Sequence, residues 1–119
     1  MTKQVLVVED HDLNRKLLTM LVQSEGHRVS EATTVAEVHE RLRDTVPDLI
    51  LMDINLPDGD GLSLTRELRA DQRFAGTKIY AVTAYLMGEV ERLAIDAGCD
   101  GLLEKPLDTA QLLPVLRAP

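Results

Sequence analysis

Short apolar runs alternate with amphipathic stretches along the chain, and this alternation predicts a repeating strand–helix order. The predicted strands are residues 4–8, 28–32, 48–52, 78–82 and 101–103. The predicted helices are residues 12–24, a second helix from a Thr33–Thr34 cap to before Pro47, 62–70, 88–97, and a fifth that opens at the N-cap Asp108. Five such units predict an α/β fold in which helices cover both faces of a parallel sheet.

Two local features refine this prediction. The first helix carries leucines at helical spacing, which we expect to form a core stripe: Leu13, Leu17, Leu18 and Leu21. Residues 56–61 contain one proline and two glycines and predict a turn, in which Asp58 and Asp60 are turn residues.

The composition restricts the class of protein. With 119 residues, the chain has the size of one domain, and with 45% hydrophobic but only 3% aromatic residues its core is aliphatic. A net charge of −7 argues against nucleic-acid binding. No run approaches the roughly 20 apolar residues that cross a bilayer, and no signal peptide is apparent, so we expect a cytoplasmic protein without membrane insertion. The single cysteine, Cys99, is expected to be a small buried residue.

Polar residues follow four of the predicted strands. They are Glu9–Asp10, Asp53, Thr83–Ala84 and Lys105–Pro106. Because parallel strands of an open sheet end at the same edge, where ligands bind, we expect these residues to share one crevice.

The residue types indicate the chemistry of this crevice. Three carboxylates that crowd together need a cation, and Mg²⁺ prefers oxygen ligands. We expect Asp10 and Asp53 to bind Mg²⁺ directly, Glu9 to bind through water, and the Asn55 carbonyl to add an oxygen. Lys105, the Thr83 hydroxyl and the Ala84 N–H are suited to a phosphoryl group. Asp53 would then be the nucleophile that forms an acyl phosphate.

Together, these residues resemble the signature of bacterial response-regulator receiver domains, and Pro57 and Gly61 fit the family's loop after the phospho-acceptor. Residues 8–14, 48–54 and 81–84 are most similar to a stand-alone receiver that regulates cell division. The resemblance implies a doubly wound, flavodoxin-like sheet of order 2-1-3-4-5 with five helices. It also implies a cis Lys105–Pro106 peptide and Mg²⁺-dependent phosphorylation of Asp53 by a sensor histidine kinase or a histidine phosphotransfer protein.

The resemblance also implies how the signal leaves the domain. We expect residues 1–119 to be a single receiver domain without an output domain, and a monomer or weak dimer. A downstream protein would bind the face formed by helix four, strand five and helix five. Such a protein is not an enzyme toward other substrates and promotes only its own phosphorylation and dephosphorylation.

Three positions depart from the family pattern or modify it. Leu102 stands where receivers often carry an aromatic residue, which puts the coupled threonine–aromatic switch in doubt. Tyr85 follows Thr83 by two residues, and we hypothesise that with Asn55 it limits water access and slows loss of the phosphoryl group. Pro114 lies inside the fifth helix, where it either distorts the helix or marks a frayed end.

Two other functions compete with this interpretation. A Mg²⁺-dependent phosphohydrolase with an aspartyl nucleophile typically needs a second acid two residues later, where this chain has Asn55. A flavin- or nucleotide-binding domain needs a glycine-rich loop after the first strand, where this chain has four acidic or histidine residues. The histidines His11, His27 and His39 are expected to be surface residues without metal-ligand partners.

Overall fold

The computed structural model describes residues 2–84 and 88–118. The strands are β1 (Gln4–Val8), β2 (Arg28–Ala32), β3 (Leu49–Asp53), β4 (Asn55–Leu56), β5 (Gly59–Asp60), β6 (Lys78–Thr83) and β7 (Gly101–Glu104). The helices are α1 (Asp12–Ser24), α2 (Val35–Asp44), α3 (Gly61–Arg69), the 3-10 turn η1 (Gln72–Phe74), α4 (Gly88–Ala97) and α5 (Thr109–Arg117).

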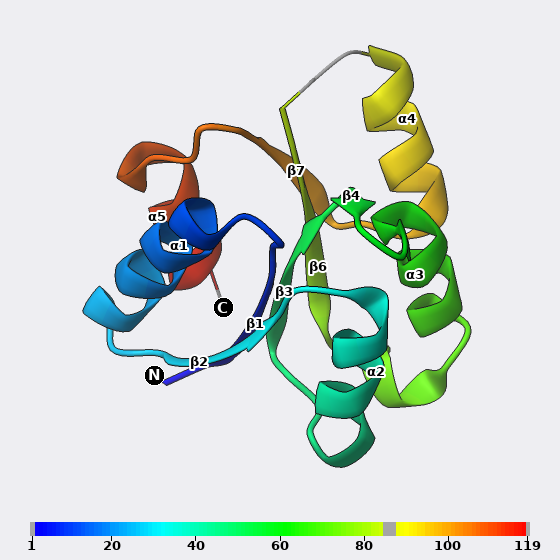
Figure 1. The fold of residues 1–119 in the computed structure, drawn as a ribbon, viewed down its shortest axis with the longest axis horizontal. Helices are drawn as coiled ribbons and strands as arrows, with labels where there is room; N and C mark the ends of the chain where they lie inside the picture. The colour runs from blue at the N-terminus through cyan, green and yellow to red at the C-terminus, as the bar shows by residue number, and fades with distance from the viewer. Residues whose placement is uncertain (1, 85–87, 119) are drawn as a thin grey trace.

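The main sheet has the expected doubly wound topology. Its five strands run parallel in the order β2-β1-β3-β6-β7, which is the order 2-1-3-4-5 of the five predicted strands. Helices α1 and α5 lie on one side of the sheet and α2, α3 and α4 on the other (Figure 1). The fold class predicted from the sequence is therefore confirmed.

Strand alternation divides the core between the two faces of the sheet. Along β1, Leu6 and Val8 join a cluster with α2, α3 and α4, whereas Val5 and Val7 join a cluster with α1 and α5. All five residues of β3 are buried, because this central strand is covered on both sides. Cys99 is buried in the first cluster, as expected.

The expected leucine stripe of α1 is partly wrong. Leu18 and Val22 are buried against the sheet, but Leu13 is 70% exposed and Leu17 is 50% exposed. The helix turns only one narrow face to the sheet, and the 3.6-residue period carries Leu13 and Leu17 away from it. The N-cap of α1 is His11 in extended conformation, and its side chain makes no capping hydrogen bond within the described residues.

Other local predictions have mixed outcomes. The capping of α2 by Thr34 is confirmed, since its side chain accepts a hydrogen bond from the amide of Glu37. The predicted turn at residues 56–61 contains a short antiparallel hairpin of β4 and β5. Helix α5 continues three residues past the exposed Pro114, so the proline does not end it. Among the described residues, no helix has both the length and the apolar character to cross a membrane.

Candidate functional site at the carboxyl edge of the sheet

A buried ion-pair cluster joins the ends of three strands. Glu9 follows β1, Asp53 ends β3, and Lys105 follows β7. The Lys105 Nζ atom lies 2.8 Å from Glu9 Oε1 and 3.1 Å from Asp53 Oδ2. The side chains of Glu9 and Asp53 are only 1% and 5% exposed, so water screens this cluster weakly.

The shared ammonium group affects the two carboxylates differently. Burial raises the pKa of Asp53 to about 6, and repulsion by Glu9 adds to this, although the Asn55 amide and Lys105 oppose it. Burial also disfavours the ionised form of Glu9, but hydrogen bonds from Lys105 and from the His11 amide outweigh it and lower the pKa. Burial likewise opposes the charge of Lys105, yet contact with Glu9 and Asp53 raises its pKa. Of the two carboxylates, Asp53 therefore has its negative charge less well compensated than Glu9 does.

Two further groups complete an acidic cluster. One donor atom each from Glu9, Asp10, His11 and Asp53 lies within 4.8 Å of the others. The Asp10 Oδ1 atom is buried and accepts no hydrogen bond from the described residues. Oxygen ligands of this kind, with one oxygen lacking a hydrogen bond, fit a hard divalent cation such as Mg²⁺.

Backbone groups of the segment after β3 contact Asp53 and fix the start of α3. The backbone amide of Asn55 donates to Asp53 Oδ1 at 3.1 Å, and the amide of Gly61 donates to the Ile54 carbonyl at 2.7 Å. A Cβ atom on Gly61 would lie 2.2 Å from the Asp53 carbonyl oxygen and 3.0 Å from the Ile54 Cα. Only glycine allows helix α3 to start this close to the end of β3.

The other predicted site residues lie as follows. Thr83 is buried at the carboxyl end of β6, and Ala84 follows it and is exposed. Leu102 is partly buried against the cluster of α2, α3 and α4. The Lys105–Pro106 peptide is cis, as expected. Tyr85 lies outside the described residues.

For His11, the prediction of a surface residue is confirmed, but the expectation that it has no partner among possible metal ligands is wrong. Its side chain is 70% exposed, but the ring Nδ1 lies 3.3 Å from Glu9 Oε2 and 3.4 Å from Asp10 Oδ1. His11 is adjacent to Asp10 and two residues from Glu9 in the sequence, and its ring lies beside both carboxylates at the N-cap of α1. The other two histidines have roles at the surface, since His27 accepts from the Lys3 amide and His39 contacts Glu67.

Sequence reasoning missed two supporting residues. Asp58 does not act only as a turn residue: its carboxylate accepts from the amides of Val35 at 2.7 Å and Ala36 at 3.2 Å, and so caps α2. Arg15 donates to the Glu9 carbonyl and pairs with Asp12, which fixes the β1–α1 loop. The three-residue helical spacing of Asp12 and Arg15 signals their ion pair in the sequence. Nothing local signals the contact of Asp58 with the amides of Val35 and Ala36.

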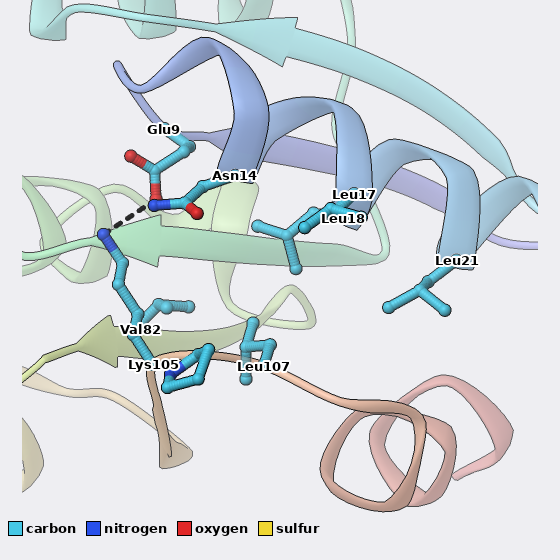
Figure 2. A pocket seen from close by; sticks show the side chains of 9 residues that line it. Glu9, Asn14, Leu17, Leu18, Leu21, Val82, Lys105 and Leu107 are labelled. Carbon is cyan, nitrogen blue, oxygen red and sulfur yellow. Dashed lines mark ion pairs between the residues drawn. The ribbon is translucent and has the colours of Figure 1, made fainter.

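An apolar pocket adjoins the ion-pair cluster. Figure 2 shows the Lys105 side chain extending to Glu9, with Asn14 of α1 beside them. The cavity has a volume of about 40 Å³ and is otherwise lined mainly by aliphatic side chains of α1 and of the segment after β7. Aliphatic side chains thus flank the Lys105–Glu9 pair on this side.

Comparisons with known proteins agree with this geometry. The family profile of the response regulator receiver domain matches residues 5–117. The polar-differentiation response regulator DivK of Brucella ovis is 35% identical over 119 residues, which are 99% of this chain and 96% of that protein. The similarity to this regulator that the sequence motifs indicated is thereby confirmed.

Solved structures show the same fold. The receiver domain of the sensor histidine kinase PA1611 from Pseudomonas aeruginosa has a magnesium ion coordinated in its active site cleft. It matches with a TM-score of 0.87 and 31% identity, over 98% of this chain and 95% of that one. The chemotaxis response regulator CheY4 of Vibrio cholerae matches with a TM-score of 0.91 and 25% identity, over 98% and 97% of the two chains.

Proposed function

Because this chain belongs to the family of response-regulator receiver domains, we propose that Asp53 accepts a phosphoryl group and that phosphorylation controls binding to another protein. The observation that supports this most is the position of Asp53. It is buried at the carboxyl end of the central strand, one oxygen contacts the Lys105 ammonium, and the other accepts the Asn55 amide. Such fixed positioning of a nucleophile among compensating charges is what phosphoryl transfer requires of a protein.

Each neighbouring residue has a proposed task. A carboxylate oxygen of Asp53 forms the new bond to phosphorus, and the bond from phosphorus to the donor's imidazole nitrogen breaks with its electron pair staying on that nitrogen. Lys105 exchanges its contact with Asp53 Oδ2 for a phosphoryl oxygen. The Thr83 hydroxyl and the Ala84 amide donate hydrogen bonds to the other phosphoryl oxygens.

We propose Mg²⁺ as the cofactor. Asp10, Asp53 and the Asn55 carbonyl would hold it directly, with Glu9 acting through water. When bound, the ion supplies positive charge that neutralises both the carboxylates and the incoming phosphoryl group. The buried Asp10 Oδ1, which accepts no hydrogen bond from the described residues, supports this assignment.

The proposed partners follow from the family. A sensor histidine kinase or a histidine phosphotransfer protein donates the phosphoryl group, and a downstream protein binds the face of α4, β7 and α5. We propose that the chain acts in a cytoplasmic phosphorelay. We further propose that the relay serves cell-division control, in line with a relative from Brucella ovis that is named for polar differentiation. Turnover of external phosphate esters is not expected, since position 55 is asparagine and a second acid is missing there.

Mass spectrometry of the intact protein tests this function. Incubation with acetyl phosphate and Mg²⁺ is expected to add one phosphoryl group, and removal of Mg²⁺ by a chelator is expected to prevent this. Asp53→Asn should stay unmodified, whereas Asp44→Asn, a matched change of an exposed residue at the end of α2, should react like the wild type. A wild-type protein that stays unmodified with every donor would contradict the proposal.

A further inference from the structure

A second charged crevice lies at the opposite, amino edge of the main sheet. Four charged residues stand where its strands begin: Lys3 before β1, Asp48 before β3, Lys78 at the start of β6 and Asp100 before β7. In the order of the strands across the sheet, positive and negative side chains therefore alternate. All four residues line one cavity of about 300 Å³. This volume is at the lower end of the range for small-ligand sites.

The backbone holds both carboxylates of this crevice in place. Asp48 Oδ2 accepts a hydrogen bond from the Gln4 amide at 2.8 Å, and Asp100 Oδ2 accepts one from the Ile79 amide at 2.8 Å. Arg69 donates to the same oxygen of Asp100 at 2.8 Å. The Oδ1 atoms of both carboxylates accept no hydrogen bond from the described residues. Each carboxylate therefore keeps one oxygen that can accept from a ligand's ammonium group.

The two lysines of the crevice differ in what they contact. Lys3 Nζ donates to the carbonyl of Ala118, just after α5. Lys78 is exposed, and its ammonium group makes no ion pair or hydrogen bond with any residue that the structure describes. Its backbone is nevertheless fixed, because its amide donates to the Asp48 carbonyl at 3.0 Å. Lys78 is therefore available to an incoming anionic group.

Apolar side chains form another part of the crevice wall. They come from Leu49 of β3, Tyr80 of β6 and Val115 of α5. The Tyr80 ring lies against Gly101 on the neighbouring strand β7, where a Cβ atom would meet the ring at 2.7 Å. The lack of a side chain at Gly101 thus gives the ring its place beside the cavity. An apolar or aromatic group of a ligand can pack against this wall.

We propose that this crevice binds a zwitterionic small molecule of the size and type of an aromatic or large apolar α-amino acid. The alternation of charge decides between classes of ligand. A simple anion that reaches Lys78 also meets Asp48 and Asp100 on the adjacent strands, and a simple cation meets the two lysines. A dipolar molecule presents its carboxylate to Lys78 and its ammonium group to Asp48 or Asp100. Its apolar side chain packs on Tyr80. The site is independent of the proposed function, because it lies at the other end of the strands from Asp53.

Titration of the isotope-labelled protein, followed by NMR, tests the proposal with three probes that share a phenyl group. L-Phenylalanine carries both charges, hydrocinnamate lacks the ammonium group, and phenethylamine lacks the carboxylate. Phenylalanine is expected to bind with a Kd of about 1 mM and to shift the amide signals of Ile79 and Asp100. Each of the other two probes should bind at least about fivefold more weakly, because one charged contact is lost.

Lys78→Met tests which residue binds the carboxylate. It should lower the affinity for phenylalanine at least about fivefold but should not weaken the binding of phenethylamine, which shows that the cavity is intact. Lys16→Met removes the same charge from an exposed position of α1 and should bind all three probes like the wild type. The proposal is overturned by any of four results: no saturable shifts with phenylalanine, equal affinity for the three probes, unchanged phenylalanine affinity in Lys78→Met, or an equal loss of phenethylamine affinity in that variant.

Discussion

At the scale of single residues, the burial of Asp53 both raises its pKa and lowers the stability of the fold at neutral pH. Its pKa is raised from 3.8 to about 6 in the folded protein, mainly by burial. The folded state therefore binds more protons than the unfolded chain between these values, and stability decreases as the pH rises through this window. Without a metal, the charge on Asp53 destabilises the fold at neutral pH.

Asp53→Asn is thus expected to be more stable than the wild type above pH 6. The shift corresponds to roughly 3 kcal/mol, and coupling to Glu9 reduces it, so we expect a gain of roughly 1–3 kcal/mol in the free energy of unfolding. The gain should disappear as the pH falls to about 4, near the unfolded pKa. Urea unfolding in the presence of a chelator measures it, and equal or lower stability of the variant at neutral pH would contradict the argument.

Gly61 supplies a second prediction at this scale. Gly61→Ala places a Cβ atom 2.2 Å from the Asp53 carbonyl oxygen, so either α3 or the end of β3 must move. We expect a loss of about 1–3 kcal/mol in stability and slower phosphorylation of Asp53. Gly76→Ala is the matched control, because a Cβ atom there meets nothing within 4 Å. Equal behaviour of the two variants in urea unfolding would show that the close approach is unimportant.

At the scale of elements, Asp58 links the loop after Asp53 to helix α2. The hydrogen bond from the Val35 amide lowers the pKa of Asp58, and the Ala36 amide adds to this. Asp58→Ala is expected to speed hydrogen exchange of the Val35 and Ala36 amides and to weaken Mg²⁺ binding, because the hairpin that carries Asn55 loses its anchor. Asp58→Asn keeps one acceptor oxygen and should restore both properties partly.

Exchange rates measured by NMR decide this prediction. If the amides of Val35 and Ala36 exchange equally fast in Asp58→Ala and in the wild type, Asp58 does not hold the start of α2. Asp60→Asn is a useful comparison, since Asp60 accepts from the Leu62 amide and caps α3 instead.

The elements themselves could largely be predicted from the sequence. The ranges of β1, β2, α1 and α4 match the prediction, and the strand and helix around Asp53 and Gly61 are shifted by one residue. These elements depend on periodicity and on caps such as Thr34 and Asp108, which are local signals.

Contacts between distant segments could not be predicted in this way. The sequence indicated that Glu9, Asp53 and Lys105 lie at one edge of the sheet. It did not indicate that the Lys105 ammonium contacts both carboxylates. The cap that Asp58 provides for Val35 spans 23 residues. The exposure of Leu13 likewise depends on how α1 rotates over the sheet, which no local pattern shows.

At the scale of the whole molecule, the two cores share the same strands. Because β1 and β3 supply side chains to both faces, we expect the cores to unfold together. Leu112 is a fully buried leucine of α5, and Leu112→Ala should lower the free energy of unfolding by roughly 2–5 kcal/mol. Unfolding followed by circular dichroism and by tyrosine fluorescence should remain one coincident transition.

A matched exposed leucine provides the control. Leu13→Ala removes a side chain of the same size that is 70% exposed, and its effect should stay within about 0.5 kcal/mol. Two separate transitions in Leu112→Ala would show that the faces of the sheet unfold independently.

The contact between Lys105 and Asp53 spans 52 positions of the chain. During synthesis on the ribosome, Asp53 emerges well before the lysine that compensates its charge. A nascent chain that has reached β6 carries the aspartate without its cation and without the last strand. Under the proposed function, the pairing that prepares Asp53 for phosphorylation therefore forms only after Lys105 has been synthesised.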